Sequence, residues 1–394
     1  MTTLSSTLEF LRRPIPTTAT TNPPHLYGAP TAEEKVVLDI GTHMVRAGFS
    51  GDHSPVHSQV LELALEEDEL EAQLISHLRP MYARSLLIDA RTRKVAIVEN
   101  GFSGARLRAA LARVLEGNLR VPDVTYYPSS VAALMTTGSV DAGLVVDCGH
   151  RVAVVTPVAE ARSLSAYATV TPLSGSALFA SLRRLLISYA RFTPANGSEC
   201  ESVESVLSHA TVSHIMQHML LASPASPPPS LHKSVGGDSQ TTCMSRDLIS
   251  FYEASTTCTA PVTSLTIDSA QGRGCLSFPG WIRERAAEPL FCGDSAADHQ
   301  SIPDAVVRSI EKTPVDLRRA LVARILVIGG VADMPGFGHR LLHDVVERLR
   351  RDPRWSALAA DAALAGRSSA CAFAPSDRAW IGTSLAVAAK IGPP

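Results

Sequence analysis

The chain has 394 residues, of which 45% are hydrophobic and 5% aromatic, and its formal net charge is −2. This length suits two domains of ordinary size with a sizeable core. The small net charge excludes the basic field used to bind nucleic acid or anionic membranes, and no apolar run is long enough to span a bilayer. The seven cysteines are scattered without metal-ligand spacing, which predicts reduced thiols in a cytosolic protein.

The first segment, residues 1–33, is rich in Thr and Pro and lacks apolar periodicity. Such a composition predicts a disordered arm. Folded structure is expected from Glu34 onward.

Two stretches of the chain then carry the same pattern. Val36–Thr42 and Leu144–His150 are each an apolar run ending in Asp-x-Gly. Each is followed by a second β-type run, Met44–Phe49 in the first case and Val152–Val158 in the second. The pattern predicts two hairpins, one near the start of each half of a duplicated fold.

The chemistry of these turns points to phosphate. Gly41 and Gly149 allow the backbone to fold back with its N–H groups pointing inward, which makes an anion-binding nest. Asp39 and Asp147, at the strand ends, are suited to hold the water shell of a divalent cation. One Asp-x-Gly alone is usually just a turn, whereas a facing pair predicts a clamp around the phosphates of a nucleotide.

A third element strengthens this interpretation. Arg324–Gly330 is a buried-type strand ending in two glycines, and a helical pattern follows over Phe337–Arg350. Glycines between a strand and a helix allow the backbone to approach a ligand closely.

The remaining pattern is mostly helical. A strand pair is predicted over Leu86–Glu99, and 222–240 is a low-complexity loop. The signal is weakest over Ser255–Gly280, where only one short strand near Leu265 is predicted. Helices are predicted over Leu61–Met81, Gly104–Glu116, Ser129–Met135, Leu173–Ala190, Ile302–Ile310 and Val315–Ala323.

Together these motifs resemble the actin superfamily. The resemblance covers nearly the whole chain, because four motifs occur in the family's order. They are the first phosphate loop (Asp39–Gly41 with Arg46–Asp52), the second phosphate loop (Asp147–Gly149), the adenosine loop (Gly329–Gly330 with Met334–Gly336) and the C-terminal signature (Ala379–Ser384). Within the superfamily, Leu86–Glu99, Val121–Pro122, Pro128–Ser129 and Val146–Gly149 are similar to the actin-related proteins of dynactin's pointed-end complex.

The resemblance implies the α/β duplicated ATPase-domain fold that actin shares with heat-shock ATPases and sugar kinases. It further implies an outer domain of residues 34–137 plus 378–394 and an inner domain of residues 138–377. ATP or ADP with Mg²⁺ would be held by Asp39, Gly41, Thr42, His43, Arg46, Asp147, Gly149, His150, Arg151, Gly329, Gly330 and Met334. Asp39 and Asp147 would hold the metal through water.

The positions that support hydrolysis in actins are changed. By the family's spacing, Ser129 stands where actins have a glutamine, and Val154 stands where they have a histidine. Neither can polarise an attacking water, since serine is too short and valine has no polar group. His43, His150 and Arg151 replace small residues of the phosphate loops, and the basic residue expected near the adenine falls at Ser376. We therefore expect no catalysis and no catalytic residues.

Two interpretations of the altered loops remain. His43 and His150 are either solvent-facing turn residues of a loop that binds nothing, or, with Arg46 and Arg151, cationic ligands of phosphates that are never cleaved. Arg46 keeps the charge of a phosphate-binding lysine with different geometry. Retention of both aspartates favours the second interpretation.

Family members place a small subdomain between the first hairpin and the strands near Leu86. Its flexible loop inserts into the next subunit of a filament. Only Ser54–Arg84 spans that gap here, and a helix uses most of it. The chain also reaches Pro394 directly after the C-terminal signature, which implies that the helices completing the actin groove are lacking. The reduced subdomain implies a pointed-end cap.

The resemblance implies a non-catalytic structural subunit of dynactin in the cytoplasm and cytoskeleton. Its partners would be actin-like filament subunits, other pointed-end subunits and, indirectly, dynein, with no nucleic acid and no membrane insertion. Two alternatives stay open: a nuclear actin-related subunit of a chromatin remodeller, and a nucleotide-hydrolysing enzyme on the same fold. Neither a basic nuclear-localisation run nor a catalytic carboxylate with a sugar pocket is recognisable.

Overall fold

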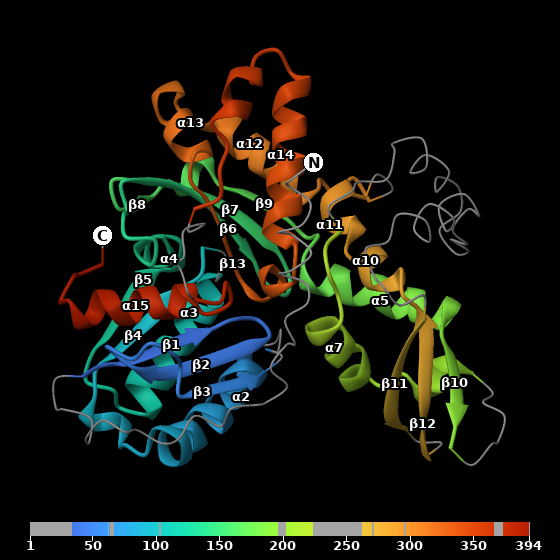
Figure 1. Ribbon diagram of the computed structural model, residues 1–394. Coiled ribbons are helices and arrows are strands. Elements are labelled where there is room, and N and C mark those ends of the chain that lie inside the picture. The colour runs from blue at the N-terminus through green and yellow to red at the C-terminus, as the bar shows by residue number, and fades with distance from the viewer. Residues whose placement is uncertain are drawn as a thin grey trace. The chain divides into compact units, whose positions relative to one another are not determined.

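Figure 1 shows the computed structural model of the protein. The residues it describes are 34–61, 63, 67–101, 104–195, 202–223, 262–269, 272–294, 297–365 and 373–393. The predicted arm of residues 1–33 and all but the first two residues of the predicted loop 222–240 lie outside them. Within the described ranges, no helix combines the length and the apolar character needed to cross a membrane.

The first half of the chain builds a five-stranded sheet of order β3-β2-β1-β4-β5. β1–β2–β3 is antiparallel, whereas β4 and β5 continue the sheet in parallel, because helices cross over between them. The elements are β1 (Val36–Ile40), β2 (Met44–Phe49), β3 (His57–Val60), α2 (Glu67–Pro80), β4 (Val95–Glu99), α3 (Ala105–Ala112), β5 (Val124–Pro128) and α4 (Ser129–Met135). π-Helical turns follow α2 and α3, over Met81–Leu86 and Arg113–Asn118.

The second half repeats this plan. β6 and β7 form an antiparallel hairpin, β9 pairs with β7 on one side, and β13 pairs in parallel with β6 on the other. A short strand, β8, extends the edge beside β7. The strands are β6 (Ala142–Cys148), β7 (Ala153–Ala159), β8 (Arg162–Ser163), β9 (Thr169–Thr171) and β13 (Ile325–Ile328). The repeated order confirms the predicted duplication.

A second group of elements is inserted between β9 and β13. Three of its strands form an antiparallel sheet of order β10-β12-β11. The elements are α5 (Gly175–Tyr189), β10 (Arg191–Pro194), α6 (Val203–Val206), α7 (His209–His218), β11 (Val262–Ser269), β12 (Gly272–Pro279), α10 (Ile282–Arg285), α11 (Glu288–Cys292), α12 (Ile302–Lys312) and α13 (Val315–Val322). The chain ends with α14 (Phe337–Arg351) and α15 (Arg378–Ala388).

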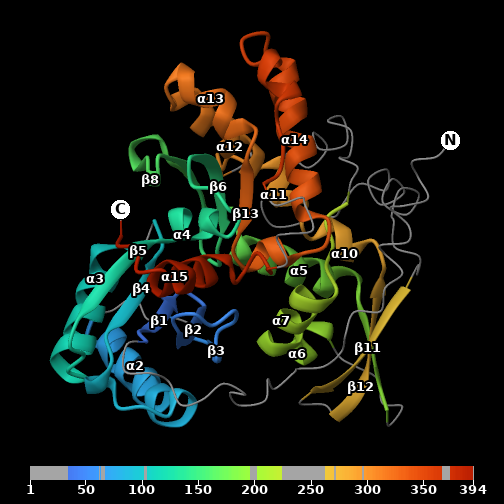
Figure 2. The same ribbon diagram turned by 60° about the vertical axis from the view of Figure 1, so that its left-hand side comes forward.

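Helices α4 and α15 join the two large sheets, and they lie side by side in Figures 1 and 2. They share one hydrophobic cluster with side chains of β1 and β4 from the first sheet and of β6 and β13 from the second. Trp380 is fully buried there, and its indole N–H donates to the Val37 carbonyl at 3.0 Å. A Cβ on Gly382 would lie only 1.8 Å from the Ala132 carbonyl oxygen, so only glycine permits this helix contact. The C-terminal signature is therefore a packing element.

Two sequence expectations were wrong near the start of the chain. Leu86–Glu99 does not hold a strand pair, because Asp89 accepts the Arg91 N–H and a 3₁₀ turn forms over Ala90–Thr92 before β4. Polar side chains that hydrogen-bond their own backbone favour such turns over strands. The helix expected from Leu61 begins at Glu67 instead.

A third expectation failed at 255–280, where a single short strand was predicted. The described part of this segment is a hairpin of two eight-residue strands, β11 and β12. The pairing of these strands was missed because several of their positions are polar or glycine. Such strands are stabilised by their neighbours more than by their own composition.

Candidate functional site

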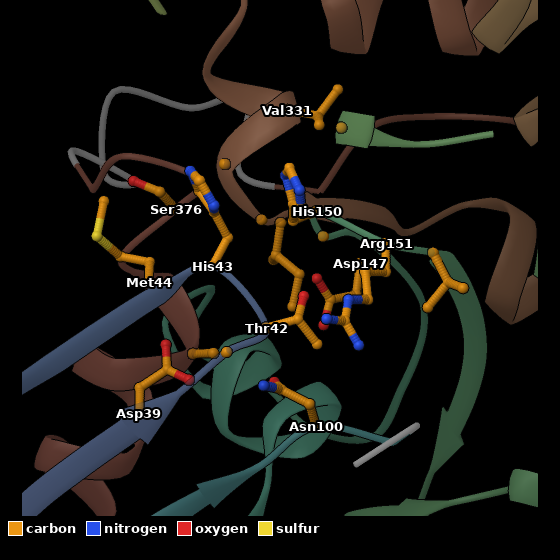
Figure 3. A pocket seen from close by; sticks show the side chains of 18 of the residues that line it. Asp39, Thr42, His43, Met44, Asn100, Asp147, His150, Arg151, Val331 and Ser376 are labelled. Atoms are coloured by element: carbon orange, nitrogen blue, oxygen red, sulfur yellow. The ribbon is translucent and has the colours of Figure 1, made fainter. Parts of the chain in front are cut away.

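A single cavity of about 710 Å³ lies where the two hairpin turns meet the loop after β13. Every residue that the sequence predicted as a nucleotide ligand lines it: Asp39, Gly41, Thr42, His43, Arg46, Asp147, Gly149, His150, Arg151, Gly329, Gly330 and Met334. Figure 3 shows how several of these side chains converge. Three segments that are far apart in the sequence thus form one site.

The two turns have the same backbone hydrogen bond. The Gly41 N–H donates to the Met44 carbonyl at 2.9 Å, and the Gly149 N–H donates to the Val152 carbonyl at 3.2 Å. A Cβ on either glycine would lie 3.2 Å from that same carbonyl oxygen. The N–H groups of the two glycines are therefore used within the turns, and an anion nest here would rely on the N–H groups of the residues that follow them.

The loop after β13 forms the third wall. Gly329 has a φ of +92°, and a Cβ there would lie 2.4 Å from the Cys148 carbonyl oxygen. Glycine therefore lets this loop approach the second turn closely. The loop before α15 is tied to the same wall, because the Ser376 N–H donates to an Asp333 carboxylate oxygen at 3.1 Å.

Asp39 and Asp147 have different surroundings despite their matching positions. Asp39 is buried, and Arg46 lies 3.5 Å from its carboxylate. Burial raises the pKa of Asp39, while Arg46 and a hydrogen bond from Asn100 act against that rise. Burial, and secondarily the nearby charge of Asp39, raise the pKa of Asp147 to about 7.

Arg46 lines the cavity and also contacts two carboxylates. Its Nε lies 3.1 Å from Asp377, in addition to the contact with Asp39. The Arg46 charge is thus largely compensated within the protein, and the predicted role of this residue as a phosphate ligand remains a prediction. Val154, at the corresponding position of the second hairpin, also lines the cavity.

His43 and His150 come together across the site. Their rings stack with centroids 4.2 Å apart and an interplanar angle of 15° (Figure 3). Arg151 donates to the Leu63 carbonyl at 2.9 Å. The two altered positions of the phosphate loops therefore contact each other in this structure.

Several cavity residues were not predicted. Asn100 and Gly101 follow β4, whose carboxyl end lies beside that of β1 in the parallel pair. Carboxyl ends of adjacent parallel strands are usual ligand sites, so strand order would have indicated them. Met216, Gln217 and His218 at the end of α7 also line the cavity, and only tertiary folding brings them there.

A divalent cation would take few protein ligands here. Among the described residues there is no group of three or more His, Cys, Asp or Glu side chains that could hold a metal ion. Mg²⁺ keeps several waters and often uses one or two carboxylates with substrate phosphates, which Asp39 and Asp147 could supply. The cavity volume and the glycine-lined walls also fit a nucleotide-sized ligand.

Comparison with known proteins agrees with this geometry. The family model for Actin matches residues 64–219 and 275–390, and the chain belongs to the actin family. It is also 23% identical to Centractin of Saccharomyces cerevisiae over 393 residues, covering 89% of each chain. The predicted actin-like fold is thereby confirmed, and members of this family generally bind a nucleotide with a divalent cation.

Proposed function

We propose that this protein is a non-catalytic actin-related subunit that caps the pointed end of the dynactin filament. It would act in the cytoplasmic cytoskeleton, support dynein-driven transport along microtubules and contact actin-like subunits and other pointed-end subunits. Within the family, this corresponds to the actin-related protein called ten or eleven in different naming schemes. The assignment to dynactin rests on the resemblance of Leu86–Glu99 and the short motifs that follow it.

One observation carries the capping role. β3 ends at Val60 and α2 begins at Glu67, so residues 61–66 alone connect them. Family members place at this point the subdomain whose loop docks into the next subunit. An open head-to-tail assembly stops when one of its two interfaces is removed. A subunit without this subdomain can join a filament end and leave its other face to different partners.

The proposed lack of catalysis has separate support. Val154 lines the cavity and offers an attacking water no hydrogen bond. Ser129 is buried at the start of α4 and is not among the described residues that line the cavity. A nucleotide held here would serve to hold the two halves together, with Asp39 and Asp147 supporting its metal.

Capping is tested by electron microscopy of filaments carrying a label on this protein. We expect label at a single end. A matched variant would carry an actin-type subdomain grafted between Val60 and Glu67, and this variant should accept further subunits where the native chain does not. Label along the filament, or equal elongation from native and grafted protein, would contradict capping. Co-purification with helicase subunits in place of dynactin subunits would favour the chromatin alternative.

Turnover is tested by a single-turnover assay with labelled ATP. We expect no phosphate release above the uncatalysed background. Release at actin-like rates would mean that another cavity side chain, such as Asn100, positions the water, and the enzyme alternative would then be correct.

A further inference from the structure

A set of contacts closes the two turns of the cavity onto each other. The His43 and His150 rings stack at 4.2 Å, and the Arg151 guanidinium donates to the Leu63 carbonyl at 2.9 Å. We call these four residues the clasp. His43 and Leu63 belong to the first half of the chain, and His150 and Arg151 to the second. The clasp therefore connects the halves directly across the cavity.

The short connection after β3 makes the clasp possible. The Leu61 N–H donates to the His43 carbonyl at 2.9 Å, so the chain runs over the first turn as soon as β3 ends. Leu61 and Leu63 are both buried, 5% and 7% exposed. Burial and hydrogen bonding place the Leu63 carbonyl where Arg151 reaches it. A long insertion at this point would not hold the chain so closely over the turn.

Stacked rings leave no space for a ligand between them. Aromatic rings with centroids 4.2 Å apart are in van der Waals contact. A phosphate that enters between the two turns must separate the rings, and it must also displace the Arg151 hydrogen bond if it approaches that side. The other part of the cavity, along Gly329, Val331 and Ser376, lies outside the clasp.

The carboxylates near the turns also disfavour a further phosphate. Asp39, Asp147 and Asp333 line the cavity, and Asp377 lies against Arg46. Arg46 is shared between two of these carboxylates, and Arg151 is directed to a backbone carbonyl. Each further phosphate on a ligand adds negative charge beside buried carboxylates, which is unfavourable unless a cation or a free arginine compensates it.

We propose that the clasp makes this cavity selective for nucleoside mono- and diphosphates over triphosphates. The bound nucleotide lies along the loop after β13, and the space that an outer phosphate would need is filled by His43 and His150. This inference rests on the nucleotide binding included in the proposed function. It adds that the contacts of the clasp hold the two turns together without a ligand between them.

Equilibrium binding on the full chain tests the proposal. Nucleotide-free protein is titrated with ADP and separately with ATP, both with excess Mg²⁺ and at one fixed pH. We expect ADP to bind about tenfold more tightly than ATP. The double variant His43→Ser with His150→Ser should bind ATP about tenfold more tightly than the native chain and ADP almost unchanged, because small side chains reopen the space between the turns.

His339→Ser is the matched control, since His339 is exposed on α14 and is not among the described residues that line the cavity. It should leave the ratio of the two affinities unchanged, and thermal unfolding should show that all variants fold. If the native chain bound ATP as tightly as ADP or more tightly, the proposed selectivity would be wrong, although the cavity would still be a nucleotide site. An unchanged ratio in the double variant would overturn the selectivity as well. Failure of the native protein to bind either nucleotide would contradict the nucleotide site itself, and capping would still be judged by microscopy.

Discussion

The hairpins β1–β2 and β6–β7 are built alike and charged differently. In each, an aspartate is the second-last residue of the first strand, and its cross-strand partner is Arg46 in the first hairpin and Val154 in the second. Asp39 therefore has a cation beside it. Asp147 makes no ion pair with any other described residue, and its pKa stands at about 7. The same local motif thus places two buried carboxylates, both with raised pKa, in different electrostatic surroundings.

The turns are also anchored by different parts of the chain. The first turn is covered by the segment after β3, through the Leu61 N–H. The second is held by the start of α5, where Gly175 and Ser176 donate to the carbonyls of Gly149 and His150. A duplicated motif keeps its backbone because glycine and hydrogen bonding determine it locally. Its chemistry changes with the elements packed around it.

The largest effect is expected at Gly329, which packs against the second turn. Gly329→Ala places a Cβ 2.4 Å from the Cys148 carbonyl oxygen at a φ of +92°. We expect a loss of about 3 kcal/mol in the free energy of unfolding, from overlap and backbone strain together. Chemical denaturation measures it. Gly330→Ala is the control, because its added Cβ would meet no atom of the described residues within 4 Å apart from its own chain neighbours. Equal losses in both variants would contradict the close approach.

A smaller effect of opposite sign is expected at Asp147. In the metal-free protein, with EDTA at pH 8, Asp147→Asn should raise the free energy of unfolding by about 2 kcal/mol, because it removes a poorly compensated carboxylate. Asp39→Asn should gain less, since it also discards the contact with Arg46. Paired denaturation curves measure the two changes. If Asp39→Asn raised the free energy of unfolding more than Asp147→Asn did, Asp39 would be the less well compensated carboxylate, contrary to our prediction.

The pH dependence of this gain tests its cause. The pKa of Asp147 is 3.8 in the reference state and about 7 in the folded protein. Its protonated form therefore contributes stability that is fully present below pH 3.8 and is lost as the pH rises through 7. In EDTA, native protein and Asp147→Asn should be equally stable near pH 4 and should diverge up to about pH 7. A constant difference across this range would show that titration is not responsible.

The smallest effect concerns the anchoring of the second turn. The Ser174 hydroxyl is buried and donates to the Gly149 carbonyl at 2.6 Å. Ser174→Ala should cost about 1 kcal/mol of stability. Ser188→Ala is the control, because its hydroxyl bonds to the Arg184 carbonyl on an exposed helix face and should matter little. Thermal unfolding of the two variants provides the comparison.

The amino-acid sequence by itself determined the local parts of this site. Asp-x-Gly after an apolar strand specifies a tight turn, and a glycine pair after a strand specifies close backbone approach, because both depend on the conformational freedom of glycine. These patterns predicted the two hairpins and the loop after β13, and the resemblance to the actin superfamily implied the twelve ligand residues that the cavity brings together. The duplicated order of strands followed from the same repeats.

Tertiary structure decided what the local patterns leave open. The stacking of His43 on His150, the hydrogen bond from Arg151 to Leu63 and the neutralisation of Arg46 by Asp377 join residues distant in the sequence. Helices α4 and α15 similarly meet through Ala132 and Gly382. Charge and steric effects act through space. The space left between the two turns and the pKa values of Asp39 and Asp147 therefore depend on which segments fold beside each turn.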